Sequence, residues 1–245
     1  MKKVAIITGA SSGIGEELSV QLSKDGYSVA VLARRAELLE KLVTRIEKSG
    51  GQALAIPCDV TIFEDMKKAV SLVEDKLGSI DLFVANAGIG RDQRLDRFDA
   101  TKAKQVYDVN VVGAMQSIAA VLPTMIARKK GHIVGIASMA AFTSFPRTYV
   151  YCASKHALVA HLDGLGLEAY KYNIDVTTIC PGFIRTPLTS KNKFPMPFLM
   201  DADVAVRRMV QGIRKRKRRV IFPRRLYWCV KFLNALPFSI RRRLL

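Results

Sequence analysis

The chain has 245 residues, of which 49% are hydrophobic, 24% charged and 8% aromatic. This composition excludes a disordered or collagen-like chain and predicts one globular domain with its own core. The formal net charge is +18, from 39 Lys and Arg residues against 21 Asp and Glu residues. Residues 214–245 hold twelve of these cations and no acid, so residues 1–213 carry 27 − 21 = +6. A mildly basic domain therefore precedes a strongly basic C-terminal segment.

Cysteine and histidine usage argues against a disulfide framework and a metal centre. The four cysteines form no CxxC pair, which favours reduced, buried thiols. The three histidines lack acidic or thiol partners at metal-ligand spacing, so we expect no metal. No apolar run reaches the 18 residues of a membrane-spanning helix. The first apolar run is short and ends in a glycine turn, which indicates a buried strand rather than a signal peptide, and we expect a cytoplasmic protein.

Short apolar runs alternate with segments of helical periodicity. The expected strands are 4–8, 28–33, 53–57, 82–85, 132–137, 175–179 and 220–222, and the expected helices are 14–24, 36–48, 64–76, 101–128, 150–172 and 201–213. This alternation predicts an α/β, doubly wound Rossmann fold, with about seven parallel strands covered by helices on both faces. Ligands of such folds bind at the carboxyl ends of the strands. We expect residues 1–222 to form one catalytic domain and residues 223–245 to be an extension.

The segment Thr8-Gly9-Ala10-Ser11-Ser12-Gly13-Ile14-Gly15 lies between the first expected strand and the first expected helix. Glycines at this place let the backbone turn sharply and approach a pyrophosphate, and the helix N-terminus offers free N–H groups. No lysine follows the last glycine, which excludes a nucleoside-triphosphate P-loop. The turn therefore favours a dinucleotide site.

The end of the second expected strand bears on which dinucleotide binds. An NAD site generally places an acidic residue there to accept from the ribose 2′-hydroxyl, whereas a 2′-phosphate favours arginine. Here the strand ends in Ala33-Arg34-Arg35, with no acid. Arg34 can offer a planar fork to a phosphate, so we expect NADP(H) in preference to NAD(H).

Several further motifs follow in order along the chain, and with them residues 1–222 resemble the short-chain dehydrogenase/reductase family. The spacing includes thirteen residues from Ser138 to Tyr151. The motifs are the glycine turn, Asp59-Val60, Asn86-Ala87-Gly88, Asn110, Ser138, Tyr151-x-x-x-Lys155 and Pro181-Gly182-Phe183-Ile184-Arg185-Thr186.

The resemblance implies four catalytic residues, and their chemistry suits carbonyl reduction. Tyr151 would protonate the carbonyl oxygen, and Lys155, one helical turn away, would lower the tyrosine pKa and reach the nicotinamide ribose. Ser138 would stabilise the developing oxyanion. Asn110 would hold a water that extends the proton relay from Lys155. Cys152, beside the tyrosine, is interpreted as a packing residue.

The resemblance also implies a set of cofactor contacts. The 2′-phosphate contact falls on Arg34, because Ser12 stands where many NADP-dependent members carry a basic residue before the second glycine. The other contacts are Gly9, Ser11, Ser12, Gly13, Ile14 and Gly15 for the phosphates, Asp59 and Val60 for the adenine, Asn86, Ala87 and Gly88 for the adenosine ribose, and Pro181, Gly182, Ile184, Thr186, Tyr151 and Lys155 for the nicotinamide side.

The leading hypothesis is an NADP(H)-dependent oxidoreductase that interconverts a carbonyl and an alcohol on an apolar, lipid-like substrate. The alternatives are a soluble 3-oxoacyl-[acyl-carrier-protein] reductase and a non-catalytic dinucleotide sensor or scaffold. An intact Ser, Tyr, Lys and Asn set argues against a sensor, which needs no proton relay. Specificity would lie in segments 142–150 and 188–199, and the three prolines at 187, 195 and 197 make the latter an expected lid.

The C-terminal segment combines arginines with an apolar, aromatic stretch at 226–236. This pattern suits peripheral contact with the cytoplasmic face of an anionic membrane, and eleven residues are too few to span one. It equally suits a flap over a lipid tunnel, packing against the core, a subunit interface or contact with acidic acyl carrier protein. We expect a homo-oligomer, a dimer or tetramer. No nucleic-acid motif is present, so nucleic acid is not an expected partner.

Overall fold

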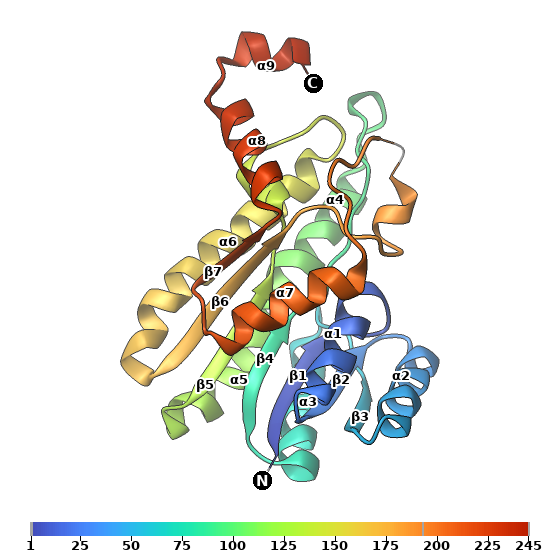
Figure 1. The fold of residues 1–245 in the computed structure, drawn as a ribbon, viewed down its shortest axis with the longest axis vertical. Coiled ribbons are helices and arrows are strands. Elements are labelled where there is room, and N and C mark those ends of the chain that lie inside the picture. The colour runs from blue at the N-terminus through green and yellow to red at the C-terminus, as the bar shows by residue number, and fades with distance from the viewer. Residues whose placement is uncertain (1, 193, 245) are drawn as a thin grey trace.

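The computed structural model describes residues 2–192 and 194–244. Within these residues seven strands form one parallel sheet in the order β3-β2-β1-β4-β5-β6-β7 (Figure 1). The expected doubly wound α/β fold is thereby confirmed. The strands are β1 (Lys3–Thr8), β2 (Tyr27–Ala33), β3 (Gln52–Pro57), β4 (Ile80–Ala85), β5 (Gly131–Ile136), β6 (Ile174–Pro181) and β7 (Arg219–Phe222).

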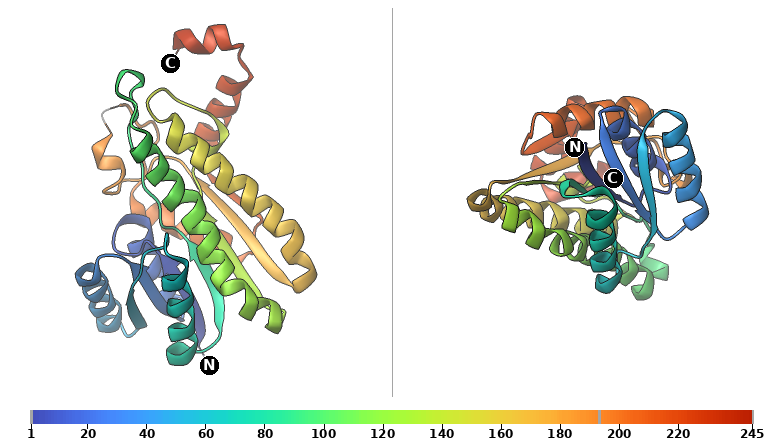
Figure 2. Two further views of the ribbon diagram at one scale, coloured as in Figure 1. Left: turned by 180° about the vertical axis from the view of Figure 1, so that it is seen from behind. Right: turned by 90° about the horizontal axis from the view of Figure 1, so that it is seen from below.

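Helices cover both faces of the sheet (Figures 1 and 2). One layer contains α1 (Gly13–Lys24), α2 (Ala36–Lys48) and α7 (Ala202–Arg214). The other contains α3 (Phe63–Leu77), α5 (Ala114–Arg128) and α6 (Tyr149–Ala169), with α4 (Ala100–Tyr107) leading into α5. Short 3₁₀ turns complete the chain at η1 (Leu95–Arg97), η3 (Met139–Phe142), η4 (Tyr170–Tyr172) and η5 (Thr189–Lys191).

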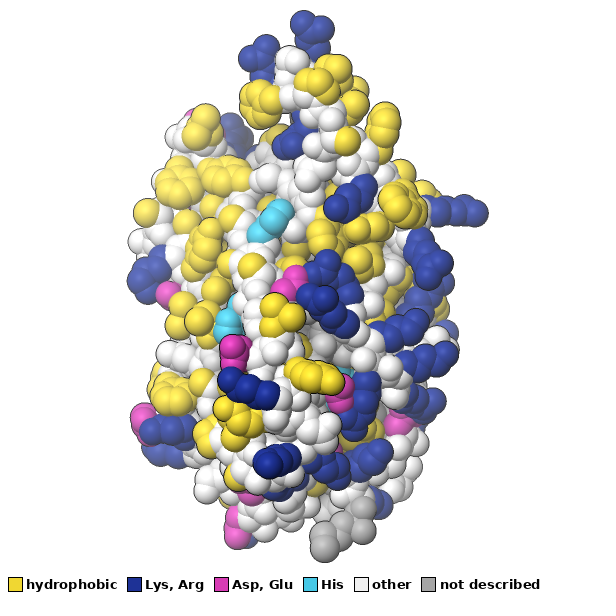
Figure 3. Space-filling view, turned by 90° about the vertical axis from the view of Figure 1, so that its left-hand side faces the viewer, with side chains coloured by type: hydrophobic (Ala, Val, Ile, Leu, Met, Phe, Trp, Pro, Cys, Tyr) yellow, Lys and Arg dark blue, Asp and Glu magenta, His cyan; other side chains and the backbone are white. Residues whose placement is uncertain are grey.

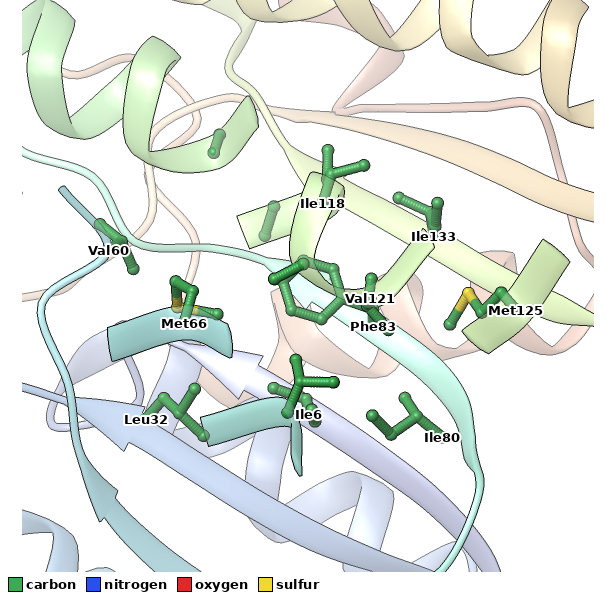
Figure 4. Close-up of a cluster of buried hydrophobic side chains, with 14 of the residues drawn as sticks. Ile6, Leu32, Val60, Met66, Ile80, Phe83, Ile118, Val121, Met125 and Ile133 are labelled. Atoms are coloured by element: carbon green, nitrogen blue, oxygen red, sulfur yellow. The ribbon is translucent and has the colours of Figure 1, made fainter. Parts of the chain in front are cut away.

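The apolar strands divide their side chains between two cores. In β1, Val4 and Ile6 face the layer of α3, α5 and α6, whereas Ala5 and Ile7 face the opposite layer. Successive side chains of a strand point to opposite faces, so a strand buried on both sides reads as an unbroken apolar run. Phe83 lies at the centre of the first core (Figure 4). This burial fixes the carboxyl ends of the strands, where the site lies.

The expected helix over 101–128 is interrupted by one wide turn. Between α4 and α5, Asp108–Gly113 is π-helical, and Asn110 lies in this turn. A Cβ at Gly113 would meet Val60 Cγ2 at 2.8 Å, so the helix passes unusually close to the segment after β3. Wide turns of this kind are frequent at functional sites. The apolar spacing of the sequence did not indicate this turn.

The continuous helical segment 100–128 corrects one expectation. By length and composition alone it could cross a membrane, although no such helix was expected from the sequence. Its residues Ile118, Val121 and Met125 are fully buried against the sheet, as in the core helix of a globular domain (Figure 4).

The C-terminal segment forms two helices, α8 (Arg224–Ala235) and α9 (Phe238–Leu244), at the end of the molecule where the strands terminate (Figure 1). α8 packs through Leu226 and Val230 against Met139 of η3 and its neighbours. Asn234 donates to the Phe142 carbonyl at 2.8 Å. In the expected lid, residues 189–191 form η5, and residue 193 lies outside the described residues, as does residue 245 of the extension.

Candidate active site

A cleft of about 270 Å³ opens at the carboxyl edge of the sheet. It brings together segments that follow β1, β2, β3 and β4 with the start of α6 and the segment after β6. Its lining includes these residues expected from the sequence: Gly9, Ser11, Ser12, Gly13, Ile14, Gly15, Arg34, Asp59, Val60, Asn86, Ala87, Gly88, Tyr151, Lys155 and Thr186.

Three expected cofactor residues lie beside this cleft rather than on its described lining. Pro181 pairs with Phe222 in the sheet. Gly182 faces α8, because a Cβ there would meet Leu226 Cδ2 at 2.9 Å. Ile184 is buried in the core under α7.

The glycine turn is built for close approach. Gly9 and Gly13 have φ of 65° and 64°, a left-handed conformation that favours glycine. A Cβ at Gly15 would lie 2.4 Å from the Gly9 carbonyl oxygen, so only glycine lets α1 begin this close to β1. The free N–H groups at the start of α1 therefore face the cleft, as an anion site requires.

Asn86 ties the end of β4 to the end of β1. Its Nδ2 donates to the Thr8 carbonyl at 2.8 Å and to the Gly9 carbonyl at 3.2 Å. Thr8 Oγ1 in turn accepts from the main-chain N–H groups of Asn86 and Ala87 at 3.0 and 3.1 Å. Asn86 lines the cleft as expected, and its amide also holds the glycine turn in place.

Two arginines follow β2, and they point to different partners. Arg34 lies 3.9 Å from the Asp59 carboxylate, and its side chain is 71% exposed. Arg35 donates to Ser11 Oγ at 2.8 Å and to Ser12 Oγ at 2.9 Å, so its guanidinium lies against the glycine turn. Both arginines line the cleft, although the sequence analysis assigned a role only to Arg34.

Tyr151 and Lys155 lie one turn apart on α6. The Lys155 ammonium donates to the Ile136 carbonyl at 2.9 Å and lies 5.8 Å from the centre of the Tyr151 ring. The Lys155 side chain is buried, and the cleft lining includes both residues. β5 and α6 therefore hold an amine and a phenol at one wall of the cleft.

Burial dominates the acid–base properties of this pair. It raises the pKa of Tyr151 to about 12, while a hydrogen bond from Ser138 acts in the opposite direction. It lowers the pKa of Lys155 to about 8. We expected Lys155 to lower the tyrosine pKa. In this structure burial outweighs such an effect, because the ammonium is directed at the Ile136 carbonyl.

Ser138 is brought to the pair by the end of β5. It caps η3, where its Oγ accepts from the Ala140 N–H at 3.1 Å. The same hydroxyl is close enough to Tyr151 to affect its pKa. The Ser138 hydroxyl thus lies beside the cleft, next to the phenol of Tyr151, which lines it.

Asn110 is fully buried, and its side chain is directed at the main chain after β4. Its Oδ1 accepts from the Ile89 N–H at 2.8 Å, and its Nδ2 donates to the Ile89 carbonyl at 2.9 Å and to Ser154 Oγ at 3.0 Å. Asn110 therefore positions Gly88 and Ile89 beside Lys155. Its expected role in a water relay stays a prediction.

The cleft also includes residues that the sequence analysis missed. Cys58 is a buried thiol whose pKa burial raises to about 11, so it stays protonated. Most of the others directly follow or precede a motif, which is the signal that could have found them. The missed residues are Ala33, Arg35, Cys58, Ile89, Val109, Ile136, Ala137, Pro187 and Leu188.

An apolar wall lies beyond Tyr151. A Cβ at Gly90 would lie 3.5 Å from Leu188 Cδ1 and 3.9 Å from Tyr151 Cδ2, so Leu188 and the phenol ring flank the same space. The Phe183 and Phe194 rings are 6.0 Å apart. Phe183 also packs in the cluster with Met139 and Leu226. Of these residues Leu188 belongs to the lining of the cleft, and it gives the cleft an apolar surface next to Tyr151.

A doubly wound sheet with a glycine turn after β1 and a Ser, Tyr and Lys set at its carboxyl edge defines a class of nicotinamide-dependent oxidoreductases. Residues 3–195 match the model of the short chain dehydrogenase family. The chain belongs to this family.

Relatives and solved structures agree with this assignment. The chain is 35% identical over 235 residues to an uncharacterized oxidoreductase from Myxococcus xanthus, covering 96% of this chain and 93% of the relative. A variant of the actinorhodin polyketide ketoreductase, solved with NADPH, is 26% identical, with a TM-score of 0.83 over 90% of this chain and 95% of its own. A short chain dehydrogenase/reductase from Burkholderia phymatum, solved with NAD, shares the fold, with a TM-score of 0.88 at 21% identity over 95% of this chain and 93% of its own.

The protein is therefore an oxidoreductase whose fold binds a nicotinamide dinucleotide. Enzymes of this family act on small carbonyl or alcohol substrates and often form oligomers.

Proposed function

We propose that the protein catalyses NADP(H)-dependent interconversion of a carbonyl and an alcohol on an apolar substrate. The observation that carries this proposal is the placement of Tyr151 and Lys155 on one wall of a cleft whose other end is the glycine turn, with Ser138 beside the phenol. A dinucleotide sensor would not need a half-buried phenol and a buried amine beside its ligand. In this proposal residues 1–222 are the catalytic domain of a cytoplasmic enzyme, and residues 223–245 are an extension.

The cleft fits a nicotinamide dinucleotide. At Gly9 and Gly15 a side chain would collide with neighbouring backbone, which leaves a cradle against the start of α1. Gly9, Ser11, Ser12, Gly13, Ile14 and Gly15 would hold the phosphates there. Asp59 and Val60 would lie at the adenine, Asn86 to Gly88 at the adenosine ribose, and Thr186 at the nicotinamide side. When bound, the dinucleotide supplies or accepts the hydride.

The chain's own residues move the proton and orient the substrate. Tyr151 remains a phenol at neutral pH because its pKa is about 12, so it can give a proton to the carbonyl oxygen as an alcohol forms. Ser138 donates to the same oxygen and stabilises its developing negative charge. Lys155 would hold the ribose hydroxyls of the bound dinucleotide, and its ammonium supplies a positive charge beside the phenol.

The preference for NADP(H) is supported by both arginines after β2. Arg34 and Arg35 line the cleft, and no acidic residue stands at the end of β2 to accept from a 2′-hydroxyl. Two guanidinium groups suit a 2′-phosphate, which carries the charge that a hydroxyl lacks.

The apolar Leu188 beside the Tyr151 ring supports an apolar substrate, such as a long-chain acyl, sphingoid or retinoid-like carbonyl. A 3-oxoacyl group on a carrier protein is the second candidate. It is favoured by the basic helices α8 and α9, which lie at this end of the molecule (Figure 1).

The test is a fluorescence titration of the full chain with NADPH and with NADH, followed by turnover with aldehydes and ketones of increasing chain length. We expect tight NADPH binding, weak NADH binding and a kcat/KM that rises with chain length. Equal or tighter NADH binding would overturn the cofactor assignment. If neither nucleotide bound, the sensor hypothesis would replace the enzymatic one.

A further inference from the structure

The cations of the C-terminal segment fall into two groups with different surroundings. The run 214–219, at the start of β7, is largely compensated by acids of the domain. Arg214 pairs with Asp25, Arg216 with Asp175, and both Arg218 and Arg219 with Asp163. These cations thus serve to join α7 and β7 to the rest of the fold.

The six cations of α8 and α9 have no such partners. No acidic residue follows Asp203 in the sequence, and within the described residues none of these six forms a salt bridge with an acidic side chain. Arg241 donates a hydrogen bond to Asn234 at 3.0 Å, and the Lys231 ammonium lies 5.9 Å from the centre of the Tyr227 ring. The six are Arg224, Arg225, Lys231, Arg241, Arg242 and Arg243.

The same two helices expose large apolar side chains. Leu226 and Val230 turn one side of α8 to the domain, which leaves Trp228 and Phe232, one turn apart, on the outer side. These two are 67% and 69% exposed, and Phe238 of α9 is 75% exposed. Ile240 and Leu244 extend this exposed apolar surface. Figure 3 shows hydrophobic and Lys or Arg side chains intermixed at the tip of the molecule.

We propose that α8 and α9 dock on the headgroup region of an anionic lipid bilayer. A helix with aromatic residues on its outer side and cations around them lies in the plane of such a surface, held by apolar insertion and by attraction to anionic lipids. α8 has twelve residues and is about 18 Å long, too short to span the hydrocarbon core. The surface therefore lies on the membrane and does not cross it.

The charge and the exposed apolar side chains of α8 and α9 argue against a second copy of the chain or a carrier protein as the partner of this surface. A second copy of the same surface would bring six cations against six cations, which repel each other. An acidic carrier protein would pair with the cations. It would not provide an apolar environment for the exposed side chains of Trp228, Phe232 and Phe238. A bilayer suits both the cations and the exposed apolar side chains, because it offers anionic headgroups above an apolar layer.

The docked orientation would bring the active site close to the membrane. α8 shares a cluster with Met139 and Phe142 of η3, which directly follows Ser138, and with Phe183, which follows β6. Figure 1 shows α8 and α9 at the end of the molecule where the loops after β4 and β5 also lie. An apolar substrate could thus pass from the bilayer to the cleft over a short distance. Docking itself does not depend on the proposed catalytic activity.

Trp228 provides a direct measurement, because it is the chain's single tryptophan. The full chain is mixed with vesicles of phosphatidylcholine alone or of phosphatidylcholine with phosphatidylglycerol, and tryptophan emission and co-sedimentation are recorded. We expect a blue shift and sedimentation only with the anionic vesicles, both diminishing with added salt. An unchanged emission spectrum with anionic vesicles would refute the proposal.

A matched pair of variants separates this surface from net charge. Arg242→Glu with Arg243→Glu should weaken binding to anionic vesicles roughly tenfold or more. Lys215→Glu with Lys217→Glu changes the net charge by the same amount in the turn between α7 and β7, and should bind nearly as well as the unchanged chain. Equal losses in the two variants would contradict the proposal.

Three further outcomes bear on the proposal. Trp228→Phe should still sediment with the anionic vesicles, whereas Trp228→Ser with Phe232→Ser should not. A blue shift that follows protein concentration without lipid would replace the membrane with a second copy. A blue shift with acyl carrier protein and none with vesicles would replace it with that partner. NADPH titration of each variant shows whether its fold is intact.

Discussion

Arg35 donates to the Oγ of Ser11 at 2.8 Å and so joins the end of β2 to the glycine turn. The neighbouring Arg34 instead lies near Asp59. Arg35 is thus already placed against the turn expected to hold the phosphates, while Arg34 stands at the outer rim.

We predict that Arg34→Ala and Arg35→Ala each weaken NADPH binding far more than NADH binding. A hydrogen bond to a charged group contributes about 1.5–3 kcal/mol, so the expected loss for NADPH is roughly 10- to 100-fold. Arg45→Ala is the control, since Arg45 pairs with Glu16 and Glu17 rather than lining the cleft. Equal losses for both nucleotides would refute the role of the substituted arginine in selecting the 2′-phosphate.

Tyr151→Phe should reduce turnover by about 10²- to 10⁴-fold, because it removes the proton donor and leaves the packing in place. NADPH affinity should change little. Tyr149→Phe provides the matched control, since Tyr149 lies two residues earlier on α6 and its ring stacks on Phe98 at 6.4 Å. The measurement is steady-state kinetics beside a binding titration. Full activity in the Tyr151 variant would eliminate the proposed mechanism.

The pH dependence should differ between the two directions of the reaction. Reduction needs the protonated phenol, and with a pKa of about 12 Tyr151 stays protonated through pH 7 to 9. Oxidation needs the phenolate, whose fraction rises about tenfold per pH unit below that pKa. Initial rates in both directions should therefore show kcat/KM for oxidation climbing with pH while that for reduction changes much less. An oxidation profile that levels off below pH 8 would show that neighbouring charges lower the tyrosine pKa after all.

Stability should fall in mild acid because of His132. This side chain is buried in β5, its Nε2 lies 2.8 Å from Thr177 Oγ1, and burial lowers its pKa from 6.5 to about 4. Between these values the unfolded chain binds the proton more readily, so the free energy of unfolding decreases as pH drops from about 6.5 toward 4. By pH 5 the expected contribution is a loss of about 2 kcal/mol.

Urea unfolding at pH 7 and pH 5 tests this prediction. His132→Gln should lose much of the difference between the two pH values, and His156→Gln should retain it, because His156 is exposed on α6. If both variants kept the full difference, His132 would not account for the acid sensitivity, which would then come from carboxylates or from His161, whose pKa burial also lowers.

Much of the fold could be predicted from the sequence because the sheet is buried on both faces. Each strand then appears as an apolar run in the sequence. Gly9, Gly13 and Gly15 mark the turn after β1, where a side chain would be strained or would collide with neighbouring atoms. Most of the expected cofactor residues line the cleft for the same reason, since the carboxyl ends of parallel strands meet at one edge.

Other features depend on contacts that a linear pattern does not contain. The wide turn at Asp108–Gly113, which contains Asn110, is π-helical, and no single residue type in the sequence marks it. Arg34 and Arg35 are equivalent in the sequence, and only the geometry assigns them different partners. The run 214–219 counts toward the basic C-terminal segment in the sequence, whereas in the structure Asp25, Asp163 and Asp175 neutralise much of it across long sequence separations.

The position of Phe183 limits how independently the C-terminal helices can vary. Its ring lies 6.0 Å from that of Phe194, and it also packs in the cluster that contains Leu226 of α8. The extension therefore packs on the segment that leads from β6 to Thr186 of the cleft. Residues 223–245 could not be exchanged with those of a relative without affecting this segment. Substrate range would change along with the extension unless positions 142 and 183 were exchanged with it.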